Sequence, residues 1–177
     1  MELVARPQNG TGLWDVCWLP DGRSVVFGTR SLNAAALRKL DLRTRETSVL
    51  PGSEGLTYPK CGPQGQILAT RSTTGVDVGL SLVVRWPDHG TWEEVGPVRG
   101  EYQTWTRDGR SFCSLFGNRV GCYSFARRRY ETLAEIGDMS LLVWVNVPWM
   151  SLDLDDSPMV MRDVSTFDLY ALDWEAP

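Results

Sequence analysis

One motif occurs four times along the chain, and this repetition limits the possible folds more than any other feature. The stretch 18–27 (WLPDGRSVVF) returns as 105–114 (WTRDGRSFCS), with a weaker copy at 61–69 (CGPQGQILA) and a worn copy at 152–161 (LDLDDSPMVM). Taking Asp21, Gln64, Asp108 and Asp155 as equivalent gives steps of 43, 44 and 47 residues. This is the length of one four-stranded blade of a β-propeller.

The centre of each copy has the composition of a tight turn. Pro20 presets one backbone angle, Gly22 supplies a positive φ, and Asp21 can bond its own backbone. Asp108 and Gly109 have the same places in the third copy, and we interpret all five residues as structural. A first strand is expected before each turn. Second strands are expected at 25–28, 67–70, 112–115 and 159–162, third strands at 36–42, 80–85, 119–125 and 168–173, and fourth strands at 47–50, 92–95 and 130–133.

The repeats predict one all-β propeller domain over residues 1–177, with four-stranded blades at about 13–50, 56–96, 101–134 and 141–174. The last repeat lacks a fourth strand, and residues 2–5 have the composition of the end of one. This amino-terminal strand either closes a four-bladed ring or completes a blade of a larger, open propeller. We favour closure, because the strand count comes out even and because open end blades would expose apolar faces.

The repeats resemble the TolB-type (PD40, WD40-like) β-propeller family, whose consensus is close to Trp-Ser-Pro-Asp-Gly-Lys followed by an apolar strand. Residues 18–27 match this consensus well, and the ending 155–174 resembles the carboxyl end of bacterial regulators that carry such repeats. In those regulators a winged-helix or protein-kinase module precedes the propeller. The resemblance covers nearly the whole chain. It implies a protein-binding propeller in the carboxyl-terminal part of a bacterial signalling protein.

Charge and hydropathy exclude two classes of partner. The chain has 22 acidic and 18 basic residues and a net charge of −4, whereas a nucleic-acid surface needs clustered Lys and Arg. The one basic run, 127–129, is interpreted as a solvated turn. The first residues do not have the pattern of a signal peptide, and no apolar run approaches the ~20 residues of a membrane span. We therefore predict a cytoplasmic protein that binds neither nucleic acid nor membrane.

The four cysteines, at 17, 61, 113 and 122, lack the paired spacing of a zinc site. A two-residue hairpin turn at 117–118 would place Cys113 directly opposite Cys122. Because disulfides are rare in the cytoplasm, we expect free thiols at this pair. Cys61 has the tryptophan position of its repeat, and we interpret it as a small buried hydrophobic residue.

No catalytic site, metal or cofactor is expected. Asp153, Asp155, Asp156 and Asp163 form an acidic cluster, but the run lacks the glycine and the spaced glutamate of a calcium loop. His89 falls in a turn that a propeller places at its outer rim. The sequence contains neither a Gly-x-Ser-x-Gly elbow nor a glycine-rich phosphate loop. We therefore predict that the chain is not an enzyme.

Tryptophans are the strongest candidates for a binding site. Trp14, Trp18, Trp105, Trp144 and Trp149 fall on or beside the expected first strands, which line the central channel of a propeller. Such rings usually wedge neighbouring blades together. The alternative is an aromatic pocket at one channel mouth, for which Trp14, Trp18, Trp105 and Trp149 are the candidates.

The sequence therefore predicts a non-catalytic binding or sensing module for an unidentified protein or small ligand. Two alternatives stay open. The chain could be a truncated propeller remnant without a role of its own, or a hydrolase-type enzyme that uses the acidic cluster. A closed ring predicts a monomer, and an open one predicts association.

Overall fold

The prediction of an all-β chain is confirmed. The structure, a computed structural model, describes residues 12–30, 35–73, 79–88, 90–97, 100–144 and 147–166, and within these ranges every named element is a β-strand. No helix in this part of the chain has the length and apolar character needed to cross a membrane. The strands form three four-stranded antiparallel sheets and two two-stranded ones.

Three of the expected blade ranges each contain one four-stranded sheet, with its strands in chain order. The first sheet contains β1 (Gly12–Trp18), β2 (Ser24–Arg30), β3 (Ala36–Asp41) and β4 (Thr47–Val49). The second contains β5 (Leu56–Cys61), β6 (Ile67–Thr73), β7 (Gly79–Arg85) and β8 (Trp92–Pro97). The third contains β9 (Glu101–Trp105), β10 (Ser111–Phe116), β11 (Arg119–Ser124) and β12 (Arg129–Glu135).

The fourth repeat is built differently. The described residues form two short hairpins, β13 (Val143–Trp144) with β14 (Val147–Pro148), and β15 (Met150–Leu152) with β16 (Pro158–Val160). β15 contacts β9 of the third sheet, so this hairpin continues the row of sheets. The expected strands at 2–5 and 168–173 lie outside the described residues.

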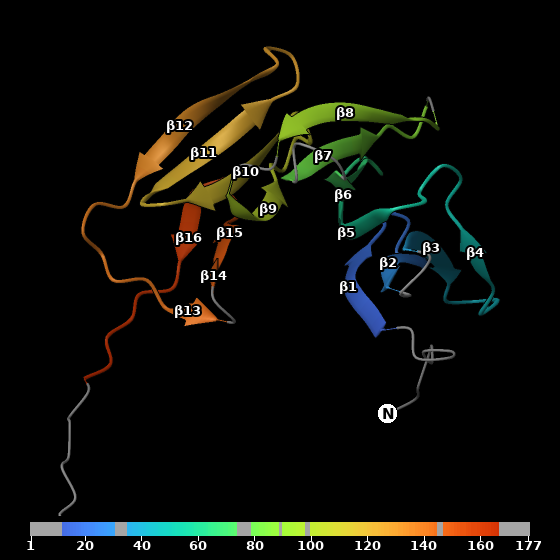
Figure 1. The fold of residues 1–177 in the computed structure, drawn as a ribbon, viewed down its shortest axis with the longest axis horizontal. Helices are drawn as coiled ribbons and strands as arrows, with labels where there is room; N and C mark the ends of the chain where they lie inside the picture. Colours follow the sequence, from blue (N-terminus) through green and yellow to red (C-terminus); the bar gives the residue numbers. More distant parts are fainter. Residues whose placement is uncertain are drawn as a thin grey trace, which may run out of the picture.

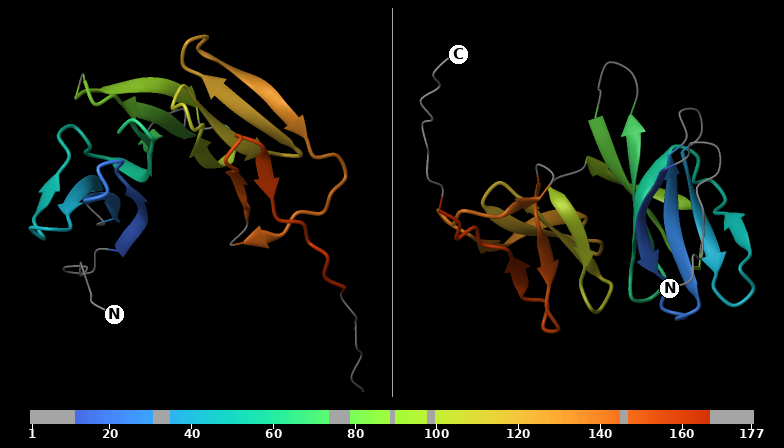
Figure 2. Two further views of the ribbon diagram at one scale, coloured as in Figure 1. Left: turned by 180° about the vertical axis from the view of Figure 1, so that it is seen from behind. Right: turned by 90° about the horizontal axis from the view of Figure 1, so that it is seen from below.

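The sheets follow an open arc whose inner side is formed by β1, β5, β9 and β15 (Figures 1 and 2). β1 contacts β5, β5 contacts β9, and β9 contacts β15. The first sheet and the β15–β16 hairpin lie at opposite ends of this arc. Our preference for a closed ring is therefore wrong for this structure, because strand parity constrains each blade but not the angle between blades.

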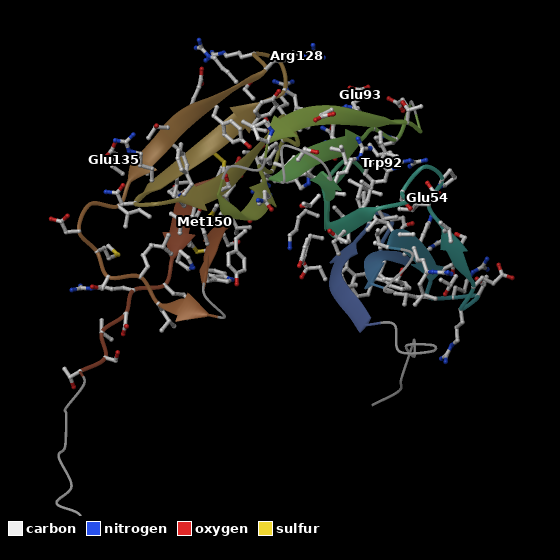
Figure 3. All side chains as sticks on the ribbon, viewed as in Figure 1. Glu54, Trp92, Glu93, Arg128, Glu135 and Met150 are labelled. Carbon is white, nitrogen blue, oxygen red and sulfur yellow. A yellow bond between two sulfur atoms is a disulfide. The ribbon has the colours of Figure 1, made fainter. Side chains whose placement is uncertain are left out.

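Successive side chains along a strand point to opposite faces of its sheet. Each inner sheet therefore sends apolar side chains into both of its interfaces with neighbouring sheets, which we call seams. In β6, Ile67 and Ala69 join a cluster with Val26 of the first sheet, whereas Leu68 joins one with Phe112 of the third. In β10, Phe112 faces the second sheet, and Cys113 and Leu115 face Met150 of β15. Figure 3 shows Met150 on the inner side of the arc and Glu93, Arg128 and Glu135 on its outer side.

Candidate functional site

The repeat turns have one backbone geometry. In each turn, the residue at the glycine position donates its backbone N–H to the backbone carbonyl of the residue three places before it. The pairs are Gly22 with Leu19, Gly65 with Gly62, Gly109 with Thr106, and Asp156 with Asp153. All four of these donors have a positive φ, between 60° and 88°. The spacing of 43, 44 and 47 residues is therefore a spacing of equivalent turns.

The aspartates of the Asp-Gly turns act on their own backbone, as predicted. Asp21 Oδ1 accepts N–H bonds from Arg23 and Ser24, each at 2.9 Å. Asp108 Oδ1 accepts one from the Arg110 N–H at 2.9 Å and one from the Thr106 hydroxyl at 2.8 Å. These bonds, the backbone one first, lower the pKa of both carboxyls below the usual aspartate range. Both carboxylates are therefore ionised and hydrogen-bonded at neutral pH.

The acidic cluster of the fourth repeat has the same structural use. Asp153 Oδ1 accepts the N–H groups of Asp155 and Ser157, and Asp156 Oδ1 accepts the N–H of Arg107 at 2.8 Å. Asp163 accepts from Ser165, which lowers the pKa of its carboxyl. Among the described residues, no three histidine, cysteine, aspartate or glutamate side chains are grouped as metal ligands.

The first three turns border a groove of about 390 Å³ on the inner side of the arc, where β1, β5 and β9 end. We name it the mouth groove. Its walls come from equivalent positions of three repeats and are mostly apolar, with one guanidinium. The lining residues are Trp18, Leu19, Pro20, Cys61, Gly62, Pro63, Thr104, Trp105, Thr106 and Arg107.

The two tryptophans of the mouth groove are repeat equivalents in different environments. Trp105 is 8% exposed, stacks on Phe125 with ring centroids 5.4 Å apart, and donates its indole N–H to the carbonyl of Lys60 at 2.8 Å. A Cβ atom at Gly62 would lie 3.0 Å from the Trp105 ring, so this position requires a glycine. Trp18 is 62% exposed. Trp105 is therefore a wedge, whereas Trp18 presents its ring to solvent.

Arg107 is held in place at the groove edge. Its backbone N–H binds Asp156, and its Nη1 donates to the carbonyl of Leu154 at 3.1 Å. A guanidinium has five N–H donors, so these contacts position Arg107 and leave donors for a ligand. The sequence reasoning missed this residue, because the repeat motif has proline or another neutral residue at the equivalent place.

Two glutamines join the second turn to the third. Gln66 is fully buried, donates from Nε2 to the carbonyl of Gly109 at 3.0 Å, and accepts the N–H of Gln64. Gln64 Nε2 donates to the carbonyl of Asp108 at 3.0 Å. Sequence reasoning missed both roles. The available signal was the replacement of Asp-Gly-Arg-Ser by Gln-Gly-Gln in the second repeat.

A disulfide joins the first two inner strands. Cys17 of β1 and Cys61 of β5 are bonded, with Cα atoms 5.4 Å apart. Lys60 Nζ also lies 3.1 Å from Asp15 Oδ2 across the same seam. The interpretation of Cys61 as a buried hydrophobic residue is therefore wrong, because the neighbouring strand brings a second cysteine to its side.

The second cysteine pair is also bonded. Cys113 and Cys122 are directly opposite each other in β10 and β11, with Gly117 and Asn118 as the loop between Phe116 and Arg119. The predicted hairpin and register are therefore confirmed. The prediction of free thiols is wrong, because the structure has a disulfide at this pair. Among the cysteines, none is free.

The remaining candidates lie apart from the groove. Trp14 is part of β1 but its side chain is outside the described ones, and Trp149 is half-buried between β14 and β15. Trp144 is in the β13–β14 hairpin. Arg127 and Arg129 both pair with Glu131 at 2.8 Å in an exposed turn. The position of His89 lies outside the described residues.

Known structures identify the architecture. The chain is similar to TolB from Acinetobacter baumannii, with 18% identity and a TM-score of 0.66 over 88% of this chain and 39% of that one. The architecture is that of a β-propeller. The chain is also similar to the propeller domain of the Trilobed protease from Pyrococcus furiosus, with 13% identity and a TM-score of 0.58 over 86% of this chain and 55% of that one. A putative TolB from Agrobacterium tumefaciens has 18% identity and a TM-score of 0.55 over 75% and 51%.

These similarities show the fold alone, as a TolB-like propeller at low sequence identity. No protein-family model matches the sequence, and no curated protein matches it. The chain spans between 39% and 55% of the lengths of these three structures.

Proposed function

We propose that this propeller is a non-catalytic binding module and that the mouth groove is its binding site. The exposed ring of Trp18 carries this proposal. A large aromatic side chain that stays 62% exposed at a preformed apolar groove has the character of an interface anchor rather than of a core residue. The role in a bacterial regulatory protein that the sequence resemblance implied is part of the same proposal.

The groove chemistry supports a ligand with an apolar body and one anionic group. Trp18, Pro20 and Pro63 offer flat apolar surface, and Arg107 offers a positioned guanidinium. The hydroxyl groups of Thr104 and Thr106 already have acceptors within the chain, the Tyr102 carbonyl for Thr104 and the Asp108 carboxylate for Thr106. Either a segment of a partner protein or a small organic acid has this chemistry.

A library of short peptides that pair an aromatic or aliphatic residue with a carboxylate tests the proposal, with tryptophan fluorescence as the readout. We expect Trp18→Ala to weaken binding about tenfold or more, the effect of losing one anchor, and Trp18→Phe to retain part of it. Arg107→Gln should weaken binding of the acidic peptides and not of their amidated forms. Leu133→Ala is the control, because this exposed residue lies on β12, away from the groove.

A small-acid library, which includes aromatic and aliphatic carboxylates, follows with the same variants. If no compound of either library binds the folded wild-type protein, or if Trp18→Ala binds as tightly as wild type, the groove is not the binding site. Activity lost on replacing Asp155 and Asp156 would instead support the hydrolase alternative. In-frame repeats ahead of Met1 in the genomic DNA would support the remnant alternative.

The compartment is a separate part of the proposal. The predicted cytoplasmic location rests on sequence features alone, whereas two disulfides are typical of proteins that work in an oxidising compartment. We therefore propose that the protein works outside the cytoplasm. Thiol labelling of the protein in its native cells tests this placement. Four reactive thiols after denaturation would restore the cytoplasmic prediction.

A further inference from the structure

The disulfide between Cys17 and Cys61 forms part of the mouth groove. Cys61 is one of the residues that line the groove, and Cys17 directly precedes Trp18 in β1. Both cysteines are half-buried at the edge of the apolar cluster between the first and second sheets. The groove therefore gives a solute a path to this bond, whereas Cys113 of the other disulfide is fully buried against Met150.

The second and third repeat turns are joined by hydrogen bonds. The side-chain amides of Gln64 and Gln66 donate to carbonyl groups of the third turn, each at 3.0 Å. The Trp105 indole N–H donates at 2.8 Å to the carbonyl of Lys60, one residue before Cys61. Because none of these three bonds involves a sulfur atom, this side of the groove should keep its shape in a reducing solution.

The first turn has no such bonds to the second. Within the described residues, every hydrogen bond of residues 19–24 stays in the first repeat. The ends of β1 and β5 are joined by the Cys17–Cys61 bond and by an ion pair between Lys60 and Asp15, whose side chains are 29% and 41% exposed. Because an ion pair that is open to water adds little stability, the disulfide is the main link at this end of the seam.

The apolar cluster of the same seam does not depend on the disulfide. It includes Val26 of the first sheet and Ile67 of the second, and Leu19 of the first turn packs against its edge. Opening the disulfide should therefore leave the two sheets packed. It should also free the first turn, with Trp18 beside it, to move relative to the second turn.

We propose that the Cys17–Cys61 disulfide is a redox switch for the mouth groove. In the oxidised form the bond fixes the position of Trp18, and the groove is ready for its ligand. In the reduced form the first turn is released, and binding is weaker. This inference rests on the binding function proposed above and adds the regulation of that site.

Reduction needs a dithiol as co-reactant. One thiolate of the dithiol attacks the Cys61 sulfur from the groove, which forms a mixed disulfide and releases Cys17 as a thiolate. The second thiolate of the dithiol then attacks the reductant's own sulfur in the mixed disulfide and releases Cys61. Two electrons pass to the protein, each cysteine takes up one proton, and the dithiol leaves as a disulfide. Arg107 lines the same groove, and its positive charge favours both the incoming and the leaving thiolate.

The change in affinity depends on how often the first turn holds its binding position. In the oxidised form the groove is preformed. In the reduced form the apparent affinity falls in proportion to the fraction of molecules in which the groove is formed. A fraction of about one tenth raises the dissociation constant about tenfold.

The order of reduction is the first test, and it needs no ligand. The folded full chain is exposed to dithiothreitol, the free thiols are alkylated at intervals, and mass spectrometry of peptides locates them. We expect Cys17 and Cys61 to be alkylated while Cys113 and Cys122 are still bonded and circular dichroism is unchanged. Earlier reduction of Cys113–Cys122, or no reduction before the chain unfolds, would overturn the proposal.

The mobility of the turns is the second test. Nuclear magnetic resonance relaxation gives backbone order parameters for the first turn, residues 19–24, and the third turn, residues 106–111. Reduction of Cys17–Cys61 should lower the order parameters of the first turn from about 0.85 to below about 0.6, and those of the third turn should not change. Cys17→Ser with Cys61→Ser should reproduce this result without a reductant. An unchanged first turn would contradict the switch.

The third test is affinity, measured with cysteine-free acidic peptides that bind the oxidised protein. Reduction of Cys17–Cys61 should raise the dissociation constant about tenfold, and re-oxidation should restore it. Cys113→Ala with Cys122→Ala is the matched control, because it lacks the disulfide that lies away from the groove. This control should bind as the wild type does, and it should weaken equally on reduction.

The outcomes separate the two proposals. If peptides bind and their affinity does not depend on the Cys17–Cys61 bond, the switch is wrong and the binding function stands. If no peptide binds the oxidised protein, the binding function is wrong. The alkylation and relaxation measurements then still decide whether the bond controls the first turn.

Discussion

Trp18 and Trp105 have the same place in two copies of one motif, and the structure uses them in opposite ways. Trp105 is buried, stacked and hydrogen-bonded, whereas Trp18 is mostly exposed. The end of β1 is held by the Cys17–Cys61 disulfide, and the end of β9 is held by the packing of Trp105. The environment of a repeat residue therefore depends on the neighbouring blade, not on the motif. Trp105 has the second sheet beside it, and Trp18 lies at the end of the row.

The largest loss of stability is expected when the packing at the end of β9 is removed. Trp105→Ala removes a buried ring, its stack on Phe125 and its bond to Lys60, and should lower the free energy of unfolding by about 3 to 5 kcal/mol. Trp18→Ala should lower it by about 1 kcal/mol or less, because the ring is already in water. Urea unfolding monitored by circular dichroism measures both. Equal losses of stability would contradict the difference between Trp18 and Trp105.

The junction of β1 and β5 should depend on its disulfide for stability. Cys17→Ser with Cys61→Ser opens a link between residues 44 positions apart, and should lower the free energy of unfolding by about 2 to 4 kcal/mol. Replacing Cys113 and Cys122 with alanines should lower the free energy of unfolding by about 1.4 kcal/mol less than this. The loop that this disulfide closes is shorter, and loop entropy grows with the logarithm of loop length. Denaturant midpoints of the two variants decide, and the reverse order would contradict this account.

The smallest effect concerns the turn carboxylates. Both have a lowered pKa in the folded chain, so they stabilise the fold above about pH 4. This contribution is lost as the pH falls through the folded pKa. Asp21→Asn and Asp108→Asn should cost about the same at pH 7, since each carboxylate accepts two hydrogen bonds. Each loss should be about 1 kcal/mol or less, because both side chains are exposed.

Unfolding titrations between pH 7 and pH 2 measure this contribution. The difference between wild type and either variant should shrink below about pH 4. A difference that stays constant with pH would show that the hydrogen bonds do not depend on the charge.

Local chemistry made much of the fold predictable. The Asp-Gly turns fix where strands begin, and the two-residue turn after Phe116 fixes the register that places Cys113 opposite Cys122. Alternation then assigns each strand residue to a seam. These features depend on residues that are close in sequence, and such patterns can be recognised without knowing the neighbours of a blade.

The features that were missed act between blades. Gln66 was given no role from the sequence, yet its amide binds the next turn. Cys17 and Cys61 are one repeat apart, and this spacing could have indicated neighbouring inner strands. Arg107 departs from the motif, and its partners are in the fourth repeat. The angle between blades, which leaves the arc open, results from the sum of such contacts and is not encoded in any single repeat.

The Cys17–Cys61 bond has a mechanical consequence. If the chain is pulled from its ends, the residues between these two cysteines cannot extend, because the bond carries the load past them. They amount to about 150 Å of contour length, at roughly 3.4 Å per residue for 44 residues. Most of the first sheet, together with β5, would therefore stay closed under force, whereas β6 to β8 and the third sheet outside its own short Cys113–Cys122 loop could unravel. A reductant would release the length held between Cys17 and Cys61 in a single step.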